Sequence, residues 1–304
     1  MRHIILLDPL DKLNLLKDTT LYFAASLLNR GYNVIFIFKP DFYINNLETV
    51  FKGFIPTFKN EEISLAEIKL ELQKDDILHM RLEPPFDINY LRTLWMLDFL
   101  QKEGVKVVND PKGIMNYQEK IFPMMEEDSI PSSVITSFDQ LNDFARITKS
   151  KSFILKPLDL FQGYGVTKVS IDHFNAEAFK SLIDDFNGFC IAQPFLEEVH
   201  EGEIRSIYFS GVEIGSIIKV PKRGSILANI AQGATFEKTE LSTKVKNKCD
   251  AMACFLNERG VPWVAFDVLA GKISEANTTC PGLLVEVSKA YEENLAHKII
   301  ELIN

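Results

Sequence analysis

The pattern of apolar and polar residues predicts a mixed α/β protein. Residues 3–7 form a short apolar run typical of a buried strand, residues 17–30 have the period of an amphipathic helix that ends at Gly31, and residues 33–38 form a second apolar run. This β-α-β order favours parallel pairing of the two strands. The loop 8–18 then lies at the carboxyl end of the first strand, where ligands bind in open α/β sheets.

The same pattern predicts strands over residues 77–81 and 105–108, with a helix over 90–102, whereas residues 59–73 form a polar stretch without a clear element. A glycine-bearing loop, 158–166, separates strands at 152–157 and 167–171, and a helix at 174–186 precedes a strand at 189–193. Ser210 and Gly211 predict a hairpin of strands 204–209 and 212–220. Residues 221–239 suggest a long mobile loop, followed by helices over 241–259 and 286–303.

A second hairpin, over residues 263–277, carries three side chains that can bind a metal ion through oxygen. Asp267, Glu275 and Asn277 lie on otherwise apolar strands, where an unpaired carboxylate is costly to bury. A three-residue connection, 270–272, would place all three on one face, whereas a two-residue Ala-Gly turn would place Asp267 and Glu275 on opposite faces. The metal hypothesis therefore requires the longer connection; the alternative is a solvated hairpin.

Composition excludes several classes of protein. The chain has 304 residues, of which 46% are hydrophobic and 25% charged, so it is an ordinary globular sequence long enough for two or three domains. A net charge of −9 argues against a nucleic-acid partner. The apolar start is too short for a secretory signal and no run approaches 18 apolar residues, which predicts a cytoplasmic protein without a membrane partner. Four cysteines without C-x-x-C spacing indicate buried thiols.

Four cations are candidates for phosphate or carboxylate contacts. Lys120 and Lys156 would suit nucleotide phosphates, and Arg81 and Arg205, on or beside apolar strands, could bind a carboxylate or phosphate through two bonds. For each, a surface position is the simpler alternative. The glycine loop matches neither the Walker A pattern nor G-x-G-x-x-G. No nucleophile motif such as G-x-S-x-G or H-E-x-x-H is present.

Taken together in order, the motifs resemble the bacterial glutathione synthetases of the ATP-grasp superfamily. The resemblance runs nearly end to end and rests on Asp8-Pro9, residues 17–20 (K-D-T-T), residues 81–87 (R-L-E-P-P-F-D), residues 108–111 and 119–120, residues 154–159 (I-L-K-P-L-D), Ala192-Gln193, Glu203-x-Arg205, residues 229–233 (N-I-A-Q-G) and Asp267 with residues 275–281 (E-A-N-T-T-C-P).

The resemblance implies an α/β chain with an ATP-grasp fold preceded by an N-terminal Rossmann-like domain. The implied boundaries are 1–115 for that domain, 116–196 for the central lid subdomain, and 197–304 for the carboxy-terminal subdomain with the metal site. Arg205 and Arg81 would be catalytic and face the reacting phosphate and the substrate carboxylate. The nucleotide-binding residues would be Lys120, Lys156, Gln162, Gly163, Gly165, Gln193, Pro194, Phe195, Leu196 and Glu203. The substrate-binding residues would be Asp18, Lys219 and Asn229, and the metal ligands Asp267, Glu275 and Asn277.

The implied reaction joins two small molecules at the expense of ATP. The γ-phosphoryl group passes to the C-terminal carboxylate of γ-glutamylcysteine, and the amine of glycine attacks the resulting acyl phosphate. The resemblance also implies ATP and two Mg²⁺ as cofactors, with Mn²⁺ as an alternative, and a homodimer or homotetramer. No protein nucleophile is needed, because metals and cations supply electrostatic stabilisation.

Several positions depart from the family pattern. Leu227 stands where a cation is expected, Lys219 replaces an arginine, the glycine loop is F-Q-G-Y-G-V (residues 161–166), and Cys280-Pro281-Gly282 replaces Ser-Pro-Thr. These changes bear on the substrate pair more than on ATP. Three alternatives therefore stay open: an ATP-grasp ligase for another peptide or amino acid, a nucleotide-binding homologue that has lost catalysis, and a small-molecule-binding α/β protein without a nucleotide.

Overall fold

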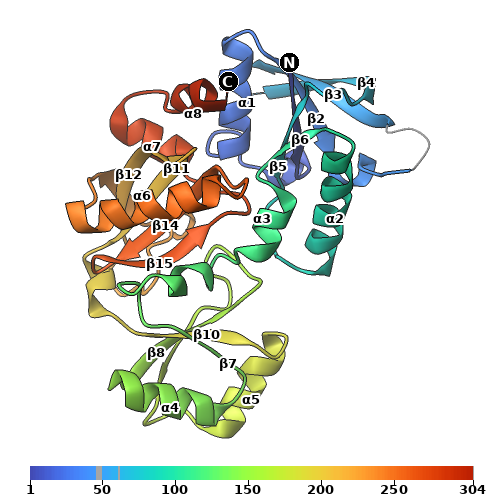
Figure 1. Ribbon diagram of the computed structural model, residues 1–304. Helices are drawn as coiled ribbons and strands as arrows, with labels where there is room; N and C mark the ends of the chain where they lie inside the picture. The colour runs from blue at the N-terminus through green and yellow to red at the C-terminus, as the bar shows by residue number, and fades with distance from the viewer. Residues whose placement is uncertain (46–49, 61, 304) are drawn as a thin grey trace.

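The chain folds around three separate sheets. The computed structural model describes residues 1–45, 50–60 and 62–303. Within them the strands form sheets of six, four and five strands, which we call the sheets of the first, second and third lobes. Figure 1 shows the third lobe in the middle, between the first lobe above and the second lobe below.

The first lobe has a mixed sheet in the order β4-β3-β2-β1-β5-β6. Its strands are β1 (Arg2–Leu7), β2 (Asn33–Phe38), β3 (Val50–Lys59), β4 (Glu62–Glu71), β5 (Ile77–Arg81) and β6 (Lys106–Val108). β1 pairs in parallel with β2 and β5, as the sequence predicts. The helices α1 (Thr19–Asn29), α2 (Ile88–Lys102) and α3 (Pro111–Asn116) each begin after an aspartate whose carboxylate accepts backbone N–H groups.

The hairpin of β3 and β4 corrects the sequence prediction, which placed no element at residues 59–73. The two strands pair antiparallel over ten residues each at the edge of the sheet. Most side chains of β4 are exposed, because β4 is the edge strand. Without a buried face the strand carries little apolar alternation, so its sequence resembles a polar loop.

The second lobe is a small antiparallel sheet covered by two helices. Its strands are β7 (Ser133–Ile135), β8 (Ser152–Pro157), β9 (Thr167–Ser170) and β10 (Cys190–Pro194), in the order β7-β10-β8-β9. The helices α4 (Phe138–Thr148) and α5 (Ala176–Asp185) pack phenylalanines against buried residues of β8. The glycine-bearing loop joins β8 to β9, as predicted.

The third lobe is an antiparallel sheet in the order β13-β12-β11-β14-β15. Its strands are β11 (Glu203–Phe209), β12 (Val212–Val220), β13 (Thr235–Lys238), β14 (Trp263–Leu269) and β15 (Lys272–Asn277), and its helices are α6 (Thr243–Asn257), α7 (Leu284–Tyr291) and α8 (Ala296–Ile303). Short 3-10 helices span Leu10–Lys12, Lys39–Asp41, Phe122–Met125, Glu197–His200 and Ile230–Gln232.

Three further predictions need correction. β13 lies in the stretch 221–239, which was expected to be a loop, and pairs with β12. The single final helix over 286–303 is two helices, because Glu292 adopts a left-handed φ of 53° and Asn294 accepts the N–H of Ala296. Of the four cysteines, Cys254 is exposed rather than buried.

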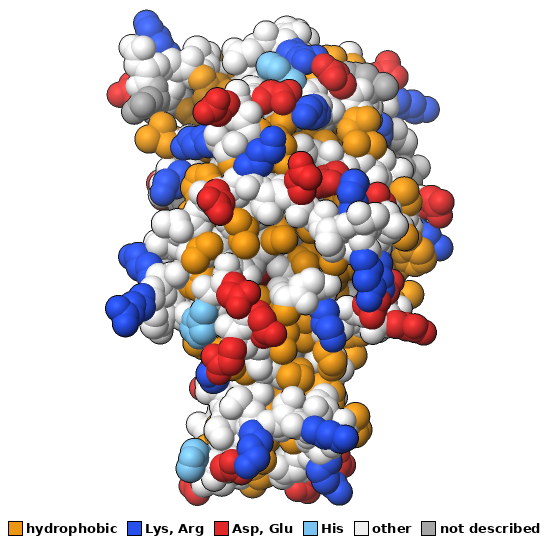
Figure 2. All heavy atoms as spheres, turned by 90° about the vertical axis from the view of Figure 1, so that its left-hand side faces the viewer, with side chains coloured by type: hydrophobic (Ala, Val, Ile, Leu, Met, Phe, Trp, Pro, Cys, Tyr) orange, Lys and Arg blue, Asp and Glu red, His pale blue; other side chains and the backbone are white. Residues whose placement is uncertain are grey.

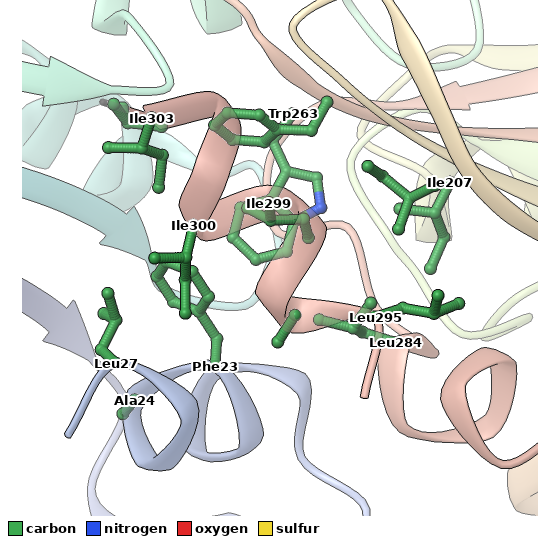
Figure 3. Packing of buried hydrophobic residues seen from close by; sticks show 14 of the residues in the cluster. Phe23, Ala24, Leu27, Ile207, Trp263, Leu284, Leu295, Ile299, Ile300 and Ile303 are labelled. Carbon is green, nitrogen blue, oxygen red and sulfur yellow. The ribbon is translucent and has the colours of Figure 1, made fainter. Parts of the chain in front are cut away.

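An apolar core joins the first lobe to the third. Phe23 and Leu27 of α1 pack with Trp263 of β14 and with Ile299 and Ile300 of α8 (Figure 3). The Phe23 and Trp263 rings meet edge to face at 5.3 Å. Because the chain's last helix packs on its first, both termini lie together at the top of Figure 1. The two lobes therefore share one buried interior.

Asn109 is a buried polar link within this junction. Its Nδ2 donates to the carbonyls of Trp263 and Thr278, both at 2.7 Å, and its Oδ1 accepts the N–H of Trp263 at 3.0 Å. The side chain thus satisfies three buried backbone groups at the end of β6 and across β14 and β15.

We expect Asn109→Ala to lower the free energy of unfolding by about 2–4 kcal/mol, because it leaves buried backbone groups without partners. Chemical denaturation measures this change. Asn257→Ala, at an exposed position in α6, is the control and should change stability by less than about 0.5 kcal/mol. Equal effects of the two substitutions would contradict the proposed link.

Candidate active site

A cavity of about 630 Å³ lies where loops of the first and second lobes meet the sheet of the third. It is lined by sixteen of the eighteen predicted site residues: Asp18, Lys120, Lys156, Gln162, Gly163, Gln193, Pro194, Phe195, Leu196, Glu203, Arg205, Lys219, Asn229, Asp267, Glu275 and Asn277. Figure 2 shows hydrophobic side chains gathering around the middle of the molecule, where it narrows toward the second lobe. The structure thus brings together residues far apart in the sequence.

The β14–β15 hairpin places Asp267 and Glu275 on one face, but not through the turn that the sequence predicts. The turn has two residues, Ala270 and Gly271, both with positive φ, so the expected three-residue connection is wrong. Asp267 nevertheless pairs with Glu275, because the register shifts at this point and Ser274 is an extra residue in β15. The Ser274 hydroxyl donates to the Asp267 carbonyl at 3.1 Å. This bulge returns Glu275 to the face of Asp267.

Asp267 is the centre of a buried ion cluster. Both of its carboxylate oxygens accept from the Arg205 guanidinium, at 2.9 and 2.8 Å, and Lys219 Nζ donates at 3.0 Å. Asn277 Nδ2 donates at 3.1 Å. Burial by itself raises the pKa of the Asp267 carboxyl, but the charges of Arg205 and Lys219 outweigh burial and hold that pKa well below its usual range. Asp267 therefore stays ionised at any physiological pH.

Strand register explains why these groups meet. Arg205 of β11 lies opposite Asp267 of β14, and Glu203 of β11 lies opposite Lys219 of β12. Lys219 Nζ bonds Glu203 at 2.8 Å as well as Asp267. Opposite charges on directly paired residues stabilise a sheet and fix its register.

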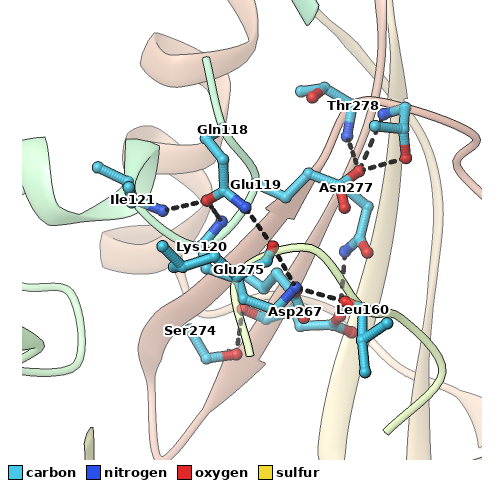
Figure 4. A network of polar contacts seen from close by, with 12 residues as sticks. Gln118, Glu119, Lys120, Ile121, Leu160, Asp267, Ser274, Glu275, Asn277 and Thr278 are labelled. Carbon is cyan, nitrogen blue, oxygen red and sulfur yellow. Dashed lines mark hydrogen bonds and ion pairs between the residues drawn. The ribbon is translucent and has the colours of Figure 1, made fainter. Parts of the chain in front are cut away.

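Lys120 links the third sheet to the glycine-bearing loop of the second lobe. Its Nζ donates to the carbonyls of Leu160 at 2.7 Å and Leu158 at 3.3 Å, and lies 3.4 Å from the Glu275 carboxylate (Figure 4). Gln118 Nε2 also donates to the Leu158 carbonyl, at 2.6 Å. The loop that follows β8 is therefore held against β15 by these two side chains.

The ion cluster holds equal numbers of carboxylates and cations. Its members are Glu203, Asp267, Glu275, Lys120, Arg205 and Lys219. Lys156 also lines the cavity and, within residues 1–45, 50–60 and 62–303, has no ion pair with a carboxylate. The cluster is thus formally neutral, and Lys156 is a cation outside it that can meet an anionic ligand.

Glu119 is a buried residue that sequence reasoning missed. Its carboxylate accepts the N–H groups of Thr278 and Thr279, at 2.8 and 2.9 Å, and the Thr279 hydroxyl at 2.7 Å. Burial raises its pKa, and the Glu275 charge raises it further. The Glu119 carbonyl accepts the N–H of Ala276 in β15. The only signal in the sequence was its position beside Lys120.

Gln193 and Phe195 line the cavity together with the apolar side chains of Ile130, Ile154 and Leu196. Gln193, at the end of β10, donates through Nε2 to the Ser132 hydroxyl at 2.9 Å and to the Ser274 carbonyl at 3.4 Å. Two residues further along the chain, the Phe195 ring makes a cation–π contact with Lys168, whose Nζ lies 3.3 Å from the ring centroid. An aromatic ring beside apolar walls and backbone polar groups suits a planar heteroaromatic base.

Two of the loops that line the cavity contact each other. Asn229 Nδ2 donates to the Gln162 carbonyl at 2.7 Å. Gly163 has a φ of 80°, and a Cβ there would lie 3.1 Å from Leu227 Cδ1, so this close approach requires glycine. Gly165 does not line the cavity: its φ is 74°, and a Cβ would meet Pro157 at 3.0 Å. Gly165 therefore shapes the loop from outside the cavity.

Arg81 also lies outside the cavity, contrary to the expectation that it faces a substrate carboxylate. Its guanidinium donates to the Pro281 carbonyl at 2.9 Å and to the Thr20 hydroxyl at 3.1 Å, and it lies over the Trp263 ring at 4.4 Å. These contacts hold the side chain within the wall. Arg81 positions that wall from behind.

Carboxylates gather where the first lobe contributes to the cavity. Asp18 caps α1 by accepting the Leu21 N–H at 2.8 Å, and its pKa is raised by burial. Burial also raises the pKa of Glu83 to about 7, although Cys280 and Arg81 act in the opposite direction. Both carboxylates line the cavity.

Comparison with protein families decides the identity of the fold. The prokaryotic glutathione synthetase N-terminal domain matches residues 1–115, and the prokaryotic glutathione synthetase ATP-grasp domain matches residues 119–292. The chain belongs to the prokaryotic glutathione synthetase family. The resemblance and the fold class inferred from the sequence motifs are confirmed, and this family member is an ATP-dependent carboxylate–amine ligase that uses ATP and a divalent metal.

Alignments with similar proteins extend over almost the whole chain of this glutathione synthetase family member. A glutathione synthetase from Parasynechococcus marenigrum is 29% identical, over 99% of this chain and 98% of that protein. One from Vibrio parahaemolyticus is 25% identical, over 98% and 96%. The crystal structure of the D-cycloserine synthetase DcsG matches with a TM-score of 0.71 at 14% identity, over 99% and 100%, which supports the fold alone. In the described part of the chain, no helix has the length and hydrophobicity needed to cross a bilayer.

The raised pKa of Glu83 predicts a pH-dependent stability. The folded state binds the Glu83 proton more tightly than the unfolded chain does, so this group makes the free energy of unfolding fall as pH rises from about 4.5 to about 7. Glu83→Gln should remove that fall, so its Tm relative to the wild type should rise between pH 5 and 7.5. Thermal melting across this range, with the exposed Glu240→Gln as control, measures the effect; parallel curves for Glu83→Gln and the wild type would contradict it.

Proposed function

We propose that this ligase joins the C-terminal carboxylate of γ-glutamylcysteine to the amine of glycine through an acyl phosphate. The observation that carries the proposal is the buried, neutral ion cluster on the wall of a cavity large enough for a nucleotide and a small peptide. Its balanced charges suit a nucleotide that arrives together with divalent cations, since ATP and two such cations add almost no net charge.

The residues at the cluster fit a divalent cation that prefers oxygen. Asp267, Glu275 and Asn277 carry oxygen donors on neighbouring positions of one hairpin face, which is the donor set that Mg²⁺ and Mn²⁺ favour. We propose that they hold two Mg²⁺, with Mn²⁺ as a substitute. Bound there, the cations would neutralise the phosphates and polarise the transferred phosphoryl group.

The cations of the cluster then acquire roles in the reaction. When Asp267 and Glu275 become metal ligands, Arg205, Lys219 and Lys120 lose carboxylate partners and can hold phosphate and acyl-phosphate oxygens instead. Lys156 is already available for a phosphate. Fixed cations aimed at developing negative charge stabilise the transition state without reorganisation at the moment of reaction.

The rest of the cavity would position the other groups. Residues 193–196 would flank adenine beside Phe195, and Glu203 would lie near the ribose. Gln162 and Gly163, together with Asn229 from the facing loop, would close over the phosphates and the peptide. Asp18 and Lys219 would contact the dipeptide, and Arg81 would keep the wall of that subsite in place.

We propose the same division of the chain as the sequence motifs imply, with an N-terminal domain at 1–115, a lid at 116–196 and a carboxy-terminal subdomain at 197–304. Small molecules are the substrates. We further propose a cytoplasmic enzyme that forms a homodimer or homotetramer.

A different substrate pair is the second candidate, and one observation favours it. Leu227 packs its side chain against Gly163, so an apolar group lines the cavity where a cation was expected from the family pattern. Its neighbours Ile226, Ala228 and Ile230 also line the cavity. Such a wall would suit a substrate with more apolar surface than γ-glutamylcysteine.

Phosphate release with Mg-ATP distinguishes the two candidates. The assay pairs γ-glutamylcysteine, glutamate and several dipeptides with glycine and other amino acids. Release with γ-glutamylcysteine plus glycine is the expected result. Release only with another pair would overturn the proposed substrates but keep the ligase, and binding of ATP without release under any pair would indicate a homologue without catalysis.

We expect Glu275→Gln to reduce turnover at least 100-fold while the protein stays folded, because it removes a charged metal ligand without changing side-chain volume. Steady-state phosphate release and thermal melting measure the two effects. Glu237→Gln, on an exposed position of β13 in the same sheet, is the control and should turn over normally. Normal activity in Glu275→Gln would refute the assignment of Glu275 as a metal ligand.

Leu227→Arg should raise kcat/KM for γ-glutamylcysteine roughly 10-fold or more if the missing cation limits the reaction, since a hydrogen bond to a charged group contributes about 1.5–3 kcal/mol. Leu227→Met, which keeps an apolar side chain of similar volume, should leave kcat/KM within about twofold. A lower kcat/KM for Leu227→Arg would show instead that this loop is built for another substrate.

A further inference from the structure

Gln193 faces the cavity from a strand whose alternate residues fill the core of the second lobe. Cys190 and Ala192 of β10 lie in that core, so the side chain of Gln193 is on the other face of the sheet. Gln193 pairs with Ile154 of β8, and both residues line the cavity. Because Gln193 is only 4% exposed, the direction of its side-chain amide decides which hydrogen-bonding group a ligand meets there.

Two oxygen acceptors fix the direction of that amide. The Ser132 hydroxyl donates its only proton to the Ile130 carbonyl at 2.8 Å, so Ser132 Oγ is left to accept from Gln193 Nε2, at 2.9 Å. The Ser274 carbonyl also accepts from Nε2, at 3.4 Å, and a carbonyl cannot donate. Both N–H bonds of the Gln193 amide are therefore directed at these two oxygens.

The Gln193 Oε1 atom is the part of the amide that remains for a ligand. Within residues 1–45, 50–60 and 62–303 it has no hydrogen-bond partner, and it is not sealed off from solvent. An amide oxygen accepts hydrogen bonds and cannot donate them. This point of the cavity therefore attracts an N–H group of a ligand and repels a carbonyl oxygen.

We propose that the amine at C6 of adenine donates to Gln193 Oε1, and that Ser132 is a positioning residue that makes the cavity select 6-aminopurine nucleotides over 6-oxopurine nucleotides. The inference rests on the proposed function, which places adenine at residues 193–196. Hypoxanthine and guanine carry a carbonyl at C6, so with either base two oxygens would meet. Ser132 does not line the cavity, and it acts on the base only through Gln193.

A reversed Gln193 amide would suit the other class of base. It would present Nε2 to the ligand, but it would also place Oε1 against the Ser274 carbonyl and against Ser132 Oγ. Ser132 could donate to that oxygen only by giving up its bond to the Ile130 carbonyl. The Ser274 contact is long, at 3.4 Å, and hydrogen bonds weaken with length. The Ser132 hydroxyl is therefore the stronger of the two constraints on the amide.

Binding of ADP and of inosine diphosphate to the full chain with Mg²⁺, measured by isothermal titration calorimetry, tests the proposal. Inosine diphosphate carries a carbonyl in place of the C6 amine. The wild type should bind ADP at least 10-fold more tightly. Ser132→Ala should reduce this ratio about threefold or more, the effect of one hydrogen bond, because the amide can then turn. Ser132→Thr keeps the hydroxyl and should retain the wild-type ratio.

Ser133→Ala is the matched control, because Ser133 is the next residue, begins β7 and does not line the cavity. It should leave the ratio within about 1.5-fold of the wild type, and thermal melting checks that each variant is folded. Equal binding of the two nucleotides by the wild type, or an unchanged ratio in Ser132→Ala, would overturn the inference and leave the proposed ligase intact. A chain that binds neither nucleotide would overturn both. Because the assay contains no peptide, its result does not depend on the substrate pair.

Discussion

The ion cluster around Asp267 is the constraint on which the rest of the site depends. A buried carboxylate is tolerated only when cations and donors surround it, and here Arg205, Lys219 and Asn277 all bond its oxygens. Strand pairing delivers these partners, because Arg205 lies opposite Asp267 across β11 and β14. The sheet register therefore determines the electrostatics of the cavity. In the proposed function, the neutral cluster exchanges its internal partners for a nucleotide and its cations.

The lobes are joined by interactions of two different kinds. The first and third lobes share an apolar core that includes Phe23, Trp263 and Ile299. The second lobe meets the third largely through polar contacts around the cavity, such as those of Lys120 and Gln193. A hydrogen bond contributes only about 1 kcal/mol net, so the shared apolar core joins the first lobe to the third by a different and larger kind of term.

The sequence predicted those parts of the fold whose residue pattern is compatible with only one kind of structure. Parallel pairing of β1 and β2 and the β11–β12 hairpin follow from apolar period and turn residues. The pairing of Asp267 with Glu275 was right for the wrong reason, because a bulge at Ser274, which no local pattern announces, replaced the longer turn. Arg81 was placed toward a substrate because a motif gives residue order and not direction. Glu119 was missed because its partners, two backbone N–H groups and the Thr279 hydroxyl, are about 160 residues away in the sequence.

The most direct test of the central claim is the binding of Mn²⁺ followed by electron paramagnetic resonance, with and without a non-hydrolysable ATP analogue. Because Arg205, Lys219 and Lys120 already neutralise the carboxylates, Mn²⁺ alone should bind weakly, and two Mn²⁺ per chain should bind tightly once the analogue is present. Equally tight Mn²⁺ binding without the nucleotide, or no increase when it is added, would contradict the account of a neutral cluster that exchanges its partners for a nucleotide and its metals.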